Sequence, residues 1–273
     1  MGKGYIHRTI KAILGRREAE NATTESKTMK HSFVRNRLKT MGLIQMALPI
    51  FLVSYFIVFP INWLLVIAGL LTGFLFWTIT MAGFHRVLSH NIVKTNNYVK
   101  AFYCFIGSMA AASPPIAWAA THIMHHNHFG TDKDPQNPNV YGWKTMFFYF
   151  APSFAEVMDK LTITEKKKFL LKIKHLIRDP ILLLFEKNYL VITLMYIILL
   201  SIIHPSMVIY FYVIPVIYTL LGHSLLVAQH FKKFDGKVNL LYPFYYGEHN
   251  HGNHHEAPGG SDGLNTLLRR AFK

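Results

Sequence analysis

The chain has two long stretches without a charged residue. Positions 40–85 and 188–231 contain no Asp, Glu, Lys or Arg. About 20 apolar residues cross a bilayer core, so each stretch is long enough for two spans joined by a short turn. Pro60 and Asn62 interrupt the first stretch, and His204 and Pro205 interrupt the second. The pattern predicts four membrane spans in two hairpins, at about 43–59, 63–84, 189–203 and 207–227.

A third uncharged stretch, 101–121, is also long enough to span a membrane. It contains Ser113, Pro114 and Pro115 near its middle, where a helix would break. If this stretch crossed the bilayer, the histidine groups before and after it would lie on opposite faces. We therefore expect residues 101–121 to form a buried or re-entrant segment of the cytoplasmic part.

Charge adds an orientation to these spans. The 29 Lys and Arg against 14 Asp and Glu give a formal charge of +15. All of them lie before residue 40, between the two hairpins or after the second, so they share one face, which the positive-inside tendency assigns to the cytoplasm. We expect a basic cytosolic segment at 1–39, a membrane domain at 40–256 and a short cytosolic tail at 257–273. The positive charge therefore indicates a membrane surface and not nucleic acid.

Three histidine clusters lie beside the apolar segments. They read HRVLSH at 85–90, HIMHH at 122–126 and HGNHH at 251–255, in a chain with 16 histidines. A single cysteine, Cys104, excludes a cysteine metal knuckle, so a metal would have to be bound by imidazole. The HExxH pattern of zinc proteases is missing. The clusters therefore predict an imidazole metal site at the membrane border.

The spacing within the clusters gives further detail. Residues three and four apart share a helix face, so His122, His125 and His126 can point to one locus, and the adjacent pair can serve two neighbouring metals. His85 and His90 differ by about 140° around an α-helix. They converge only if the helix ends between them or if they serve different metals. Eight imidazoles are too many for one ion, which favours a dinuclear site, although imidazole suits iron, zinc, copper and nickel alike.

The three clusters resemble the histidine boxes of the membrane fatty-acyl desaturases, in particular the Δ9 acyl-CoA desaturase branch. Thr131–Pro135, which reads TDKDP, and Gly247-Glu248 resemble the surroundings of the second and third boxes. The similarity covers residues 40–256 and identifies this range as a fatty acid desaturase domain. It implies an all-α integral membrane fold of four transmembrane helices in two hairpins, under a cytosolic helical cap that holds a dimetal site.

The resemblance also implies a set of nine ligands for two iron ions (Fe2+). Eight positions carry over directly: His85, His90, His122, His125, His126, His251, His254 and His255. The ninth lies at the cytoplasmic end of the fourth span, where counting back from the third box favours His223 over His230. The family's Asn-Ser-x-x-His pattern is absent at both, because Thr219 and Leu226 stand four residues earlier.

Acidic residues beside the boxes are candidates to orient the ligands. Asp132, Asp134 and Glu248 could accept hydrogen bonds from the ring N–H groups of ligand histidines. Salt bridges to lysine or arginine in the cap are the structural alternative for the same carboxylates.

The function implied by the resemblance is the desaturation of a long-chain fatty acyl group. The enzyme would use O2 and two electrons to introduce a cis double bond, at Δ9 of an acyl-CoA, with no catalytic residue separate from the metal ligands. Its partners would be a CoA-linked or lipid-linked acyl substrate, membrane lipid and a separate electron donor such as cytochrome b5 or ferredoxin with its reductase. The expected location is a bacterial cytoplasmic membrane or the endoplasmic reticulum. A hydroxylase of the same architecture is one alternative, and a non-catalytic membrane metal-binding or transport protein is another.

Overall fold

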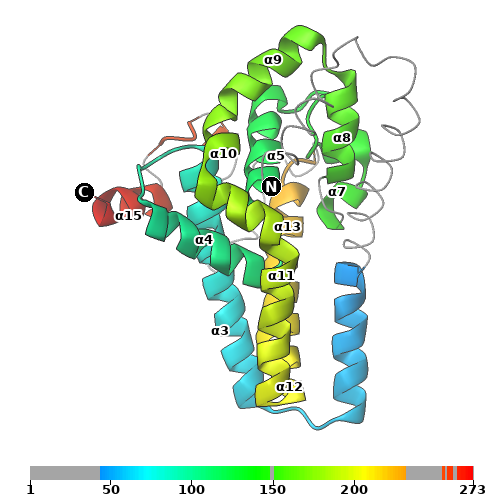
Figure 1. Ribbon diagram of the computed structural model, residues 1–273. Coiled ribbons are helices and arrows are strands. Elements are labelled where there is room, and N and C mark those ends of the chain that lie inside the picture. The colour runs from blue at the N-terminus through cyan, green and yellow to red at the C-terminus, as the bar shows by residue number, and fades with distance from the viewer. Residues whose placement is uncertain (1–43, 148–150, 232–253, 256, 261–262, 273) are drawn as a thin grey trace, which may run out of the picture.

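Long helices form one half of the molecule and shorter helices form the other (Figure 1). The computed structural model describes residues 44–147, 151–231, 254–255, 257–260 and 263–272, and these residues form helices and turns without a strand. The expectation of an all-helical protein is therefore confirmed for the described part of the chain.

Three helices are long and apolar enough to cross a membrane. The first runs over 27 residues, Trp63–Ser89, as α3 (Trp63–Thr80) followed without a break by the π-helical segment η2 (Met81–Ser89). The second is α11 (Pro180–Ile203), and the third, Pro205–Ala228, joins α12 (Pro205–Val208), η3 (Ile209–Val213) and α13 (Ile214–Ala228). At about 1.5 Å per residue each exceeds the thickness of a bilayer core of about 30 Å.

The predicted span at 43–59 corresponds to a shorter apolar helix, Ile44–Val58. The Phe56 ring of this helix lies 6.1 Å from the Tyr210 ring of η3. In the turn that follows the helix, the Asn62 amide donates to the Tyr210 hydroxyl over 3.2 Å. Fifteen described residues are fewer than the 20 or so that a span requires. The fourth span and the orientation in the membrane therefore remain predictions.

The predicted turns are present, but the start of one helix differs from expectation. The Asn62 side chain caps α3, and His204 Nδ1 accepts a hydrogen bond from the Ser206 amide where α12 begins. Helix α11 begins nine residues before the predicted span, because Asp179 caps its first turn and Pro180 occupies the first position. The predicted span was too short at its start, because Glu186 and Lys187 interrupt the uncharged stretch within this helix.

Glycines allow the first and third long helices to approach closely. A Cβ atom on Gly73 would lie 2.7 Å from the Tyr218 Cβ atom, and one on Gly69 would collide with the Tyr210 carbonyl. Small residues at helix contacts are the usual means of close packing between membrane helices. The packing brings the ends of η2 and α13 to the same region of the molecule.

The remaining helices form the cap. They are α4 (Asn97–Met109), α5 (Pro115–His128), α6 (Pro138–Tyr141), α7 (Lys144–Phe147), α8 (Ala151–Lys160), α9 (Ile163–Lys172), α10 (Lys174–Arg178) and α15 (Gly263–Ala271). The uncharged stretch 101–121 is divided between α4 and α5. The break falls at Ala111–Ser113, where Ala111 and Ser113 have φ values of 51° and 139°. The expected break is therefore confirmed, and the segment is buried in part, with Cys104 and Ala119 fully buried.

Candidate metal centre

The first histidine box lies on the π-helical end of the first long helix. The His90 amide donates to the His85 carbonyl over 3.2 Å, which is the five-residue bond of a π-helix. This wider turn places residues five apart nearly above one another, and the two ring centroids are 5.0 Å apart. The helix ends at Ser89 and His90 is its C-cap, so the rings converge where the helix ends between the two residues, as expected. The π-helical geometry of this last turn was not predicted.

The second box lies on α5, whose first turn is capped from another helix. Glu186 of α11 accepts hydrogen bonds from the amides of Ile116, over 2.8 Å, and Ala117, over 3.4 Å. The N-cap residue itself, Pro114, has no side-chain cap. Glu186 therefore fixes α5, and with it the second box, against the long helices.

Eight histidines form two groups in which the ring nitrogens converge. The first group contains His85, His90, His122, His126 and His254, and the second contains His125, His230 and His255. Within each group one nitrogen of every ring lies within 4.8 Å of the others. The adjacent histidines of the second box belong to different groups, as the spacing allowed.

Distances in the first group suit a common cation. The Nε2 atom of His254 lies 2.7 Å from that of His85 and 3.0 Å from that of His90, and His90 Nε2 lies 3.0 Å from His122 Nε2. Two nitrogens that are each about 2.1 Å from one ion lie about 3.0–3.4 Å apart at angles of about 90–109°. Nitrogens that all point inward cannot satisfy one another as hydrogen-bond partners, because each neutral ring carries one N–H.

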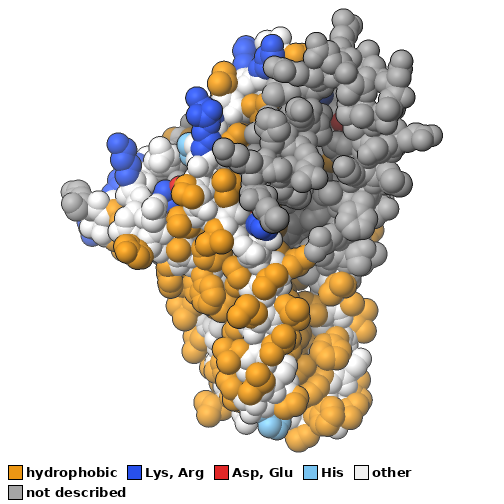
Figure 2. Space-filling model, viewed as in Figure 1, with side chains coloured by type: hydrophobic (Ala, Val, Ile, Leu, Met, Phe, Trp, Pro, Cys, Tyr) orange, Lys and Arg blue, Asp and Glu red, His pale blue; other side chains and the backbone are white. Residues whose placement is uncertain are grey.

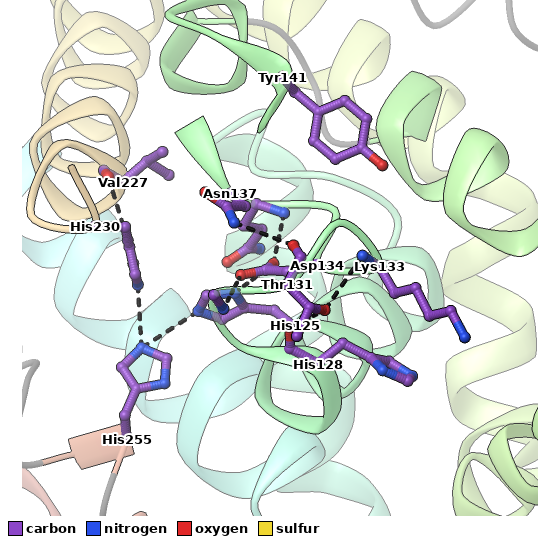
Figure 3. Close-up of polar contacts among 12 residues, drawn as sticks. His125, His128, Thr131, Lys133, Asp134, Asn137, Tyr141, Val227, His230 and His255 are labelled. Carbon is purple, nitrogen blue, oxygen red and sulfur yellow. Dashed lines mark hydrogen bonds and ion pairs between the residues drawn. The ribbon is translucent and has the colours of Figure 1, made fainter. Parts of the chain in front are cut away.

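The second group has the same character and is shown in Figure 3. His255 lies between the other two rings, with its Nε2 atom 3.0 Å from His230 Nε2 and 3.3 Å from His125 Nε2. His230 follows the last turn of α13, where its Nδ1 atom lies 3.2 Å from the Val227 carbonyl. A hydrogen bond of this kind fixes the orientation of a ligand ring.

Two expected ligands have a different status. His223, on α13, belongs to neither group of described residues, whereas His230 belongs to the second. His251 lies outside the described residues. The assignment of the ninth ligand remains a prediction, and the grouping favours His230.

One of the three candidate acids contacts a box histidine. The Asp134 carboxylate accepts from His125 Nδ1 over 2.7 Å and from the amides of Gln136 and Gly130 (Figure 3). Burial raises the pKa of this carboxyl to about 7, and the two amide hydrogen bonds oppose that shift. Asp132 is exposed, and Glu248 lies outside the described residues. Asp134 therefore makes the contact that we expect of an orienting acid.

Arg86 is a site residue that sequence reasoning did not single out. Its side chain is 1% exposed, and its Nη1 atom lies 2.7 Å from His254 Nδ1. Full burial of arginine is rare unless it is paired. A charged residue inside a histidine box, at the end of an apolar helix, was the available signal.

Burial keeps His122 of the second box neutral. Burial lowers the pKa of His122 well below its ordinary value, and the neighbouring box histidines lower it further. The ring also stacks on Trp118, with centroids 5.1 Å apart. A neutral imidazole is the form that binds a metal.

The two groups together fit a dinuclear centre with imidazole ligands. The donor set is nitrogen alone, it is buried, and His125 has a carboxylate partner of the kind that ligand histidines usually have. Imidazole ligands suit iron, copper, nickel and zinc. The fold and the site thus define a membrane protein with a buried histidine cluster that could hold metal at the end of its long helices.

Comparison with known proteins assigns the family. The family model for fatty acid desaturases matches residues 61–261, and the chain belongs to that family. The resemblance found in the histidine boxes is therefore confirmed at the level of the family.

Individual relatives include both acyl-lipid and acyl-CoA types. The chain is 36% identical over 78 residues to the sn-1 stearoyl-lipid 9-desaturase of Anabaena variabilis, which covers 28% of this chain and 29% of the relative. It is 29% identical over 189 residues to the sn-2 palmitoyl-lipid 9-desaturase of Nostoc sp., covering 64% of each. It is 28% identical over 127 residues to the stearoyl-CoA desaturase 5 of Bos taurus, covering 46% of the chain and 35% of the relative. The chain thus spans less than two thirds of each of these relatives.

Proposed function

We propose that the protein is a membrane desaturase that introduces a cis double bond into a long-chain fatty acyl group. The observation that carries this proposal is the pair of buried imidazole groups at the end of the long helices, in a chain of the fatty acid desaturase family. Two iron ions, when bound, supply the activation of O2 that side chains cannot supply. The five histidines of the first group would hold one ion and the three of the second group the other.

The ligand set follows from this grouping. His230 takes the ninth position in place of His223, because its ring nitrogen converges with those of His125 and His255. His251 keeps the role implied by the family resemblance. A separate donor, cytochrome b5 or a ferredoxin with its reductase, supplies the two electrons.

The protein's own residues position and shield the reaction. Asp134 accepts a hydrogen bond from His125 Nδ1–H and so directs the Nε2 atom of His125 toward the second group. His85, His122 and His125 are at most 1% exposed, which keeps water from the centre and prevents side reactions. Four spans with the cap on the cytoplasmic side bring this centre to the level of the acyl chains.

For the substrate we propose a saturated long-chain acyl group that is desaturated at Δ9. Support comes from the names of the relatives, which describe 9-desaturases of lipid-linked acyl groups and a desaturase of stearoyl-CoA. The resemblance in the boxes favours the acyl-CoA branch, so acyl-CoA is the form to test first. If the substrate carbon gained oxygen and did not lose a second hydrogen, the product would be a hydroxy acid. Hydroxylation is therefore the alternative outcome.

Expression in a host strain that lacks its own Δ9 desaturase tests the proposal. The expected result is a new cis monoene in the fatty acid profile, with the position of the double bond fixed by mass spectrometry of its adducts. His85→Ala should abolish the product. His204→Ala should retain it, because His204 caps α12 away from both groups.

The outcomes of this experiment separate the alternatives. Labelled stearoyl-CoA and labelled stearoyl phospholipid, given separately to isolated membranes, identify the substrate form. A hydroxy acid as the product would establish the hydroxylase. An unchanged fatty acid profile from iron-loaded protein would refute both activities and favour a non-catalytic metal protein.

The ninth ligand has a test of its own. Purified His230→Ala should contain less iron than the wild type, and His223→Ala should retain it. Iron loss in His223→Ala alone would show that the grouping in the structure is not the ligand set.

A further inference from the structure

Helix α4 carries an exposed row of aromatic side chains. Tyr98, Phe102 and Phe105 are 88%, 50% and 46% exposed. They are four and three residues apart, so they lie on one face of the helix. Single exposed apolar residues are ordinary, but three aromatics on one face of a helix form a patch that needs a partner.

The opposite face of α4 packs tightly on the π-helical segment η2. Tyr103 is buried, and a Cβ atom on Gly83 of η2 would lie 2.5 Å from its Cγ atom. In return, Gly107 of α4 gives room to the Phe84 ring, which would collide with a Cβ atom there. Each helix thus inserts an aromatic ring over a glycine of the other. The contact joins α4 firmly to the segment that carries His85.

The position of α4 in the molecule indicates what covers its aromatic face. Figure 1 shows α4 crossing obliquely in front of α3, at the level where the long helices meet the cap. In the same view, the surface of the long helices below this level is largely hydrophobic, and lysine and arginine gather above it (Figure 2). Exposed aromatics at such a boundary are typical of residues at the interface between lipid headgroups and acyl chains.

The size of the patch argues against a second copy of the chain as its partner. A fully buried aromatic side chain covers about 150–250 Å2, so the three exposed fractions amount to about 400 Å2. A stable protein interface buries about 800 Å2 on each partner. Lipid sets no such minimum, and it already surrounds the adjoining surface of the long helices.

We propose that α4 is an interfacial membrane helix whose Tyr98, Phe102 and Phe105 face insert into the boundary between headgroups and acyl chains. Its inner face then fixes the depth of η2, and with it the first histidine box, relative to the bilayer surface. This proposal rests on the geometry of α4 and not on the proposed activity.

Nitroxide labels on the full chain in lipid vesicles test the proposal. The sole cysteine, Cys104, is fully buried, so labelling of the unsubstituted chain measures the background. Phe102→Cys and Phe105→Cys carry the label in turn. Collision with O2, which concentrates in lipid, is compared with collision with a nickel chelate, which stays in water.

Two matched positions calibrate the measurement. Leu171→Cys, 69% exposed on α9, reports a cap position in water, and Leu199→Cys, 57% exposed on α11, reports a position in the span. Labels on Phe102 and Phe105 should favour O2 over nickel, with a ratio between those of the two controls. Tyr98→Cys is a further label site if either phenylalanine variant folds poorly.

Three results would overturn the proposal. Nickel accessibility equal to that at Leu171 would place the face of α4 in water. Exclusion of both reagents would show that another part of the chain covers it. Spectral broadening between labels on different chains would show that a second copy does so.

Discussion

Replacing Glu186 should destabilise the helix that carries the second histidine box. Its carboxylate accepts from the first free amides of α5, Ile116 and Ala117, and Pro114 offers no side chain of its own for this purpose. Glu186→Ala therefore leaves the buried Ile116 amide without its acceptor.

The size of the effect follows from these contacts. An unsatisfied buried donor costs about 1–3 kcal/mol, and loss of a helix cap costs about 0.5–2 kcal/mol. The two costs describe the same contacts and are not added together. We therefore expect the free energy of unfolding to fall by about 2 kcal/mol. Glu186→Gln keeps an acceptor for the two amides and should lose less stability than Glu186→Ala. For a domain of this size, about 2–4 °C of midpoint corresponds to 1 kcal/mol, which gives about 4–8 °C for the alanine variant.

Thermal unfolding of metal-free protein in detergent, followed by circular dichroism, measures this loss. Glu156→Ala is the matched control, because Glu156 is 57% exposed on α8 and only pairs with Lys160 along the helix. It should change the midpoint little, since such pairs contribute about 0.3–0.5 kcal/mol. The reasoning is refuted if Glu186→Ala unfolds at the same temperature as Glu156→Ala.

Two further substitutions test contacts around the centre. Asp134→Asn should lower metal affinity about 10–100-fold, because the charged partner of His125 is lost, while the exposed Asp132→Asn should leave it unchanged; a metal titration measures both. Gly83→Ala should destabilise the fold by about 1–3 kcal/mol through overpacking against Tyr103, as measured by thermal unfolding. Adding Tyr103→Leu should recover part of this loss, and strictly additive effects would contradict the contact.

Much of the architecture could be predicted from the sequence, because membranes restrict the choices. Long charge-free segments must be helical in lipid, and prolines at 60, 114, 115 and 205 mark the breaks that the structure shows. The start of α11 at Pro180 could not be read from the charge-free stretch, because Glu186 and Lys187 interrupt it and the Asp179 cap determines where the helix begins.

The site was predictable in its residue types but not in its geometry. Spacing alone brings His122, His125 and His126 to one side of a helix, but it does not reveal that His85 and His90 share a π-helical turn. Contacts between segments that are far apart in sequence decide the rest. Only the packed structure selects His230 for the second group and pairs Arg86 with His254.

The iron content of the purified protein tests the central claim most directly. Elemental analysis of protein purified without added metal should give about two irons per chain, since the imidazoles form two separate groups. Asp134→Asn should retain less iron than Asp132→Asn in the same preparation. One zinc per chain and no iron would contradict the dinuclear iron centre and the desaturase function that rests on it.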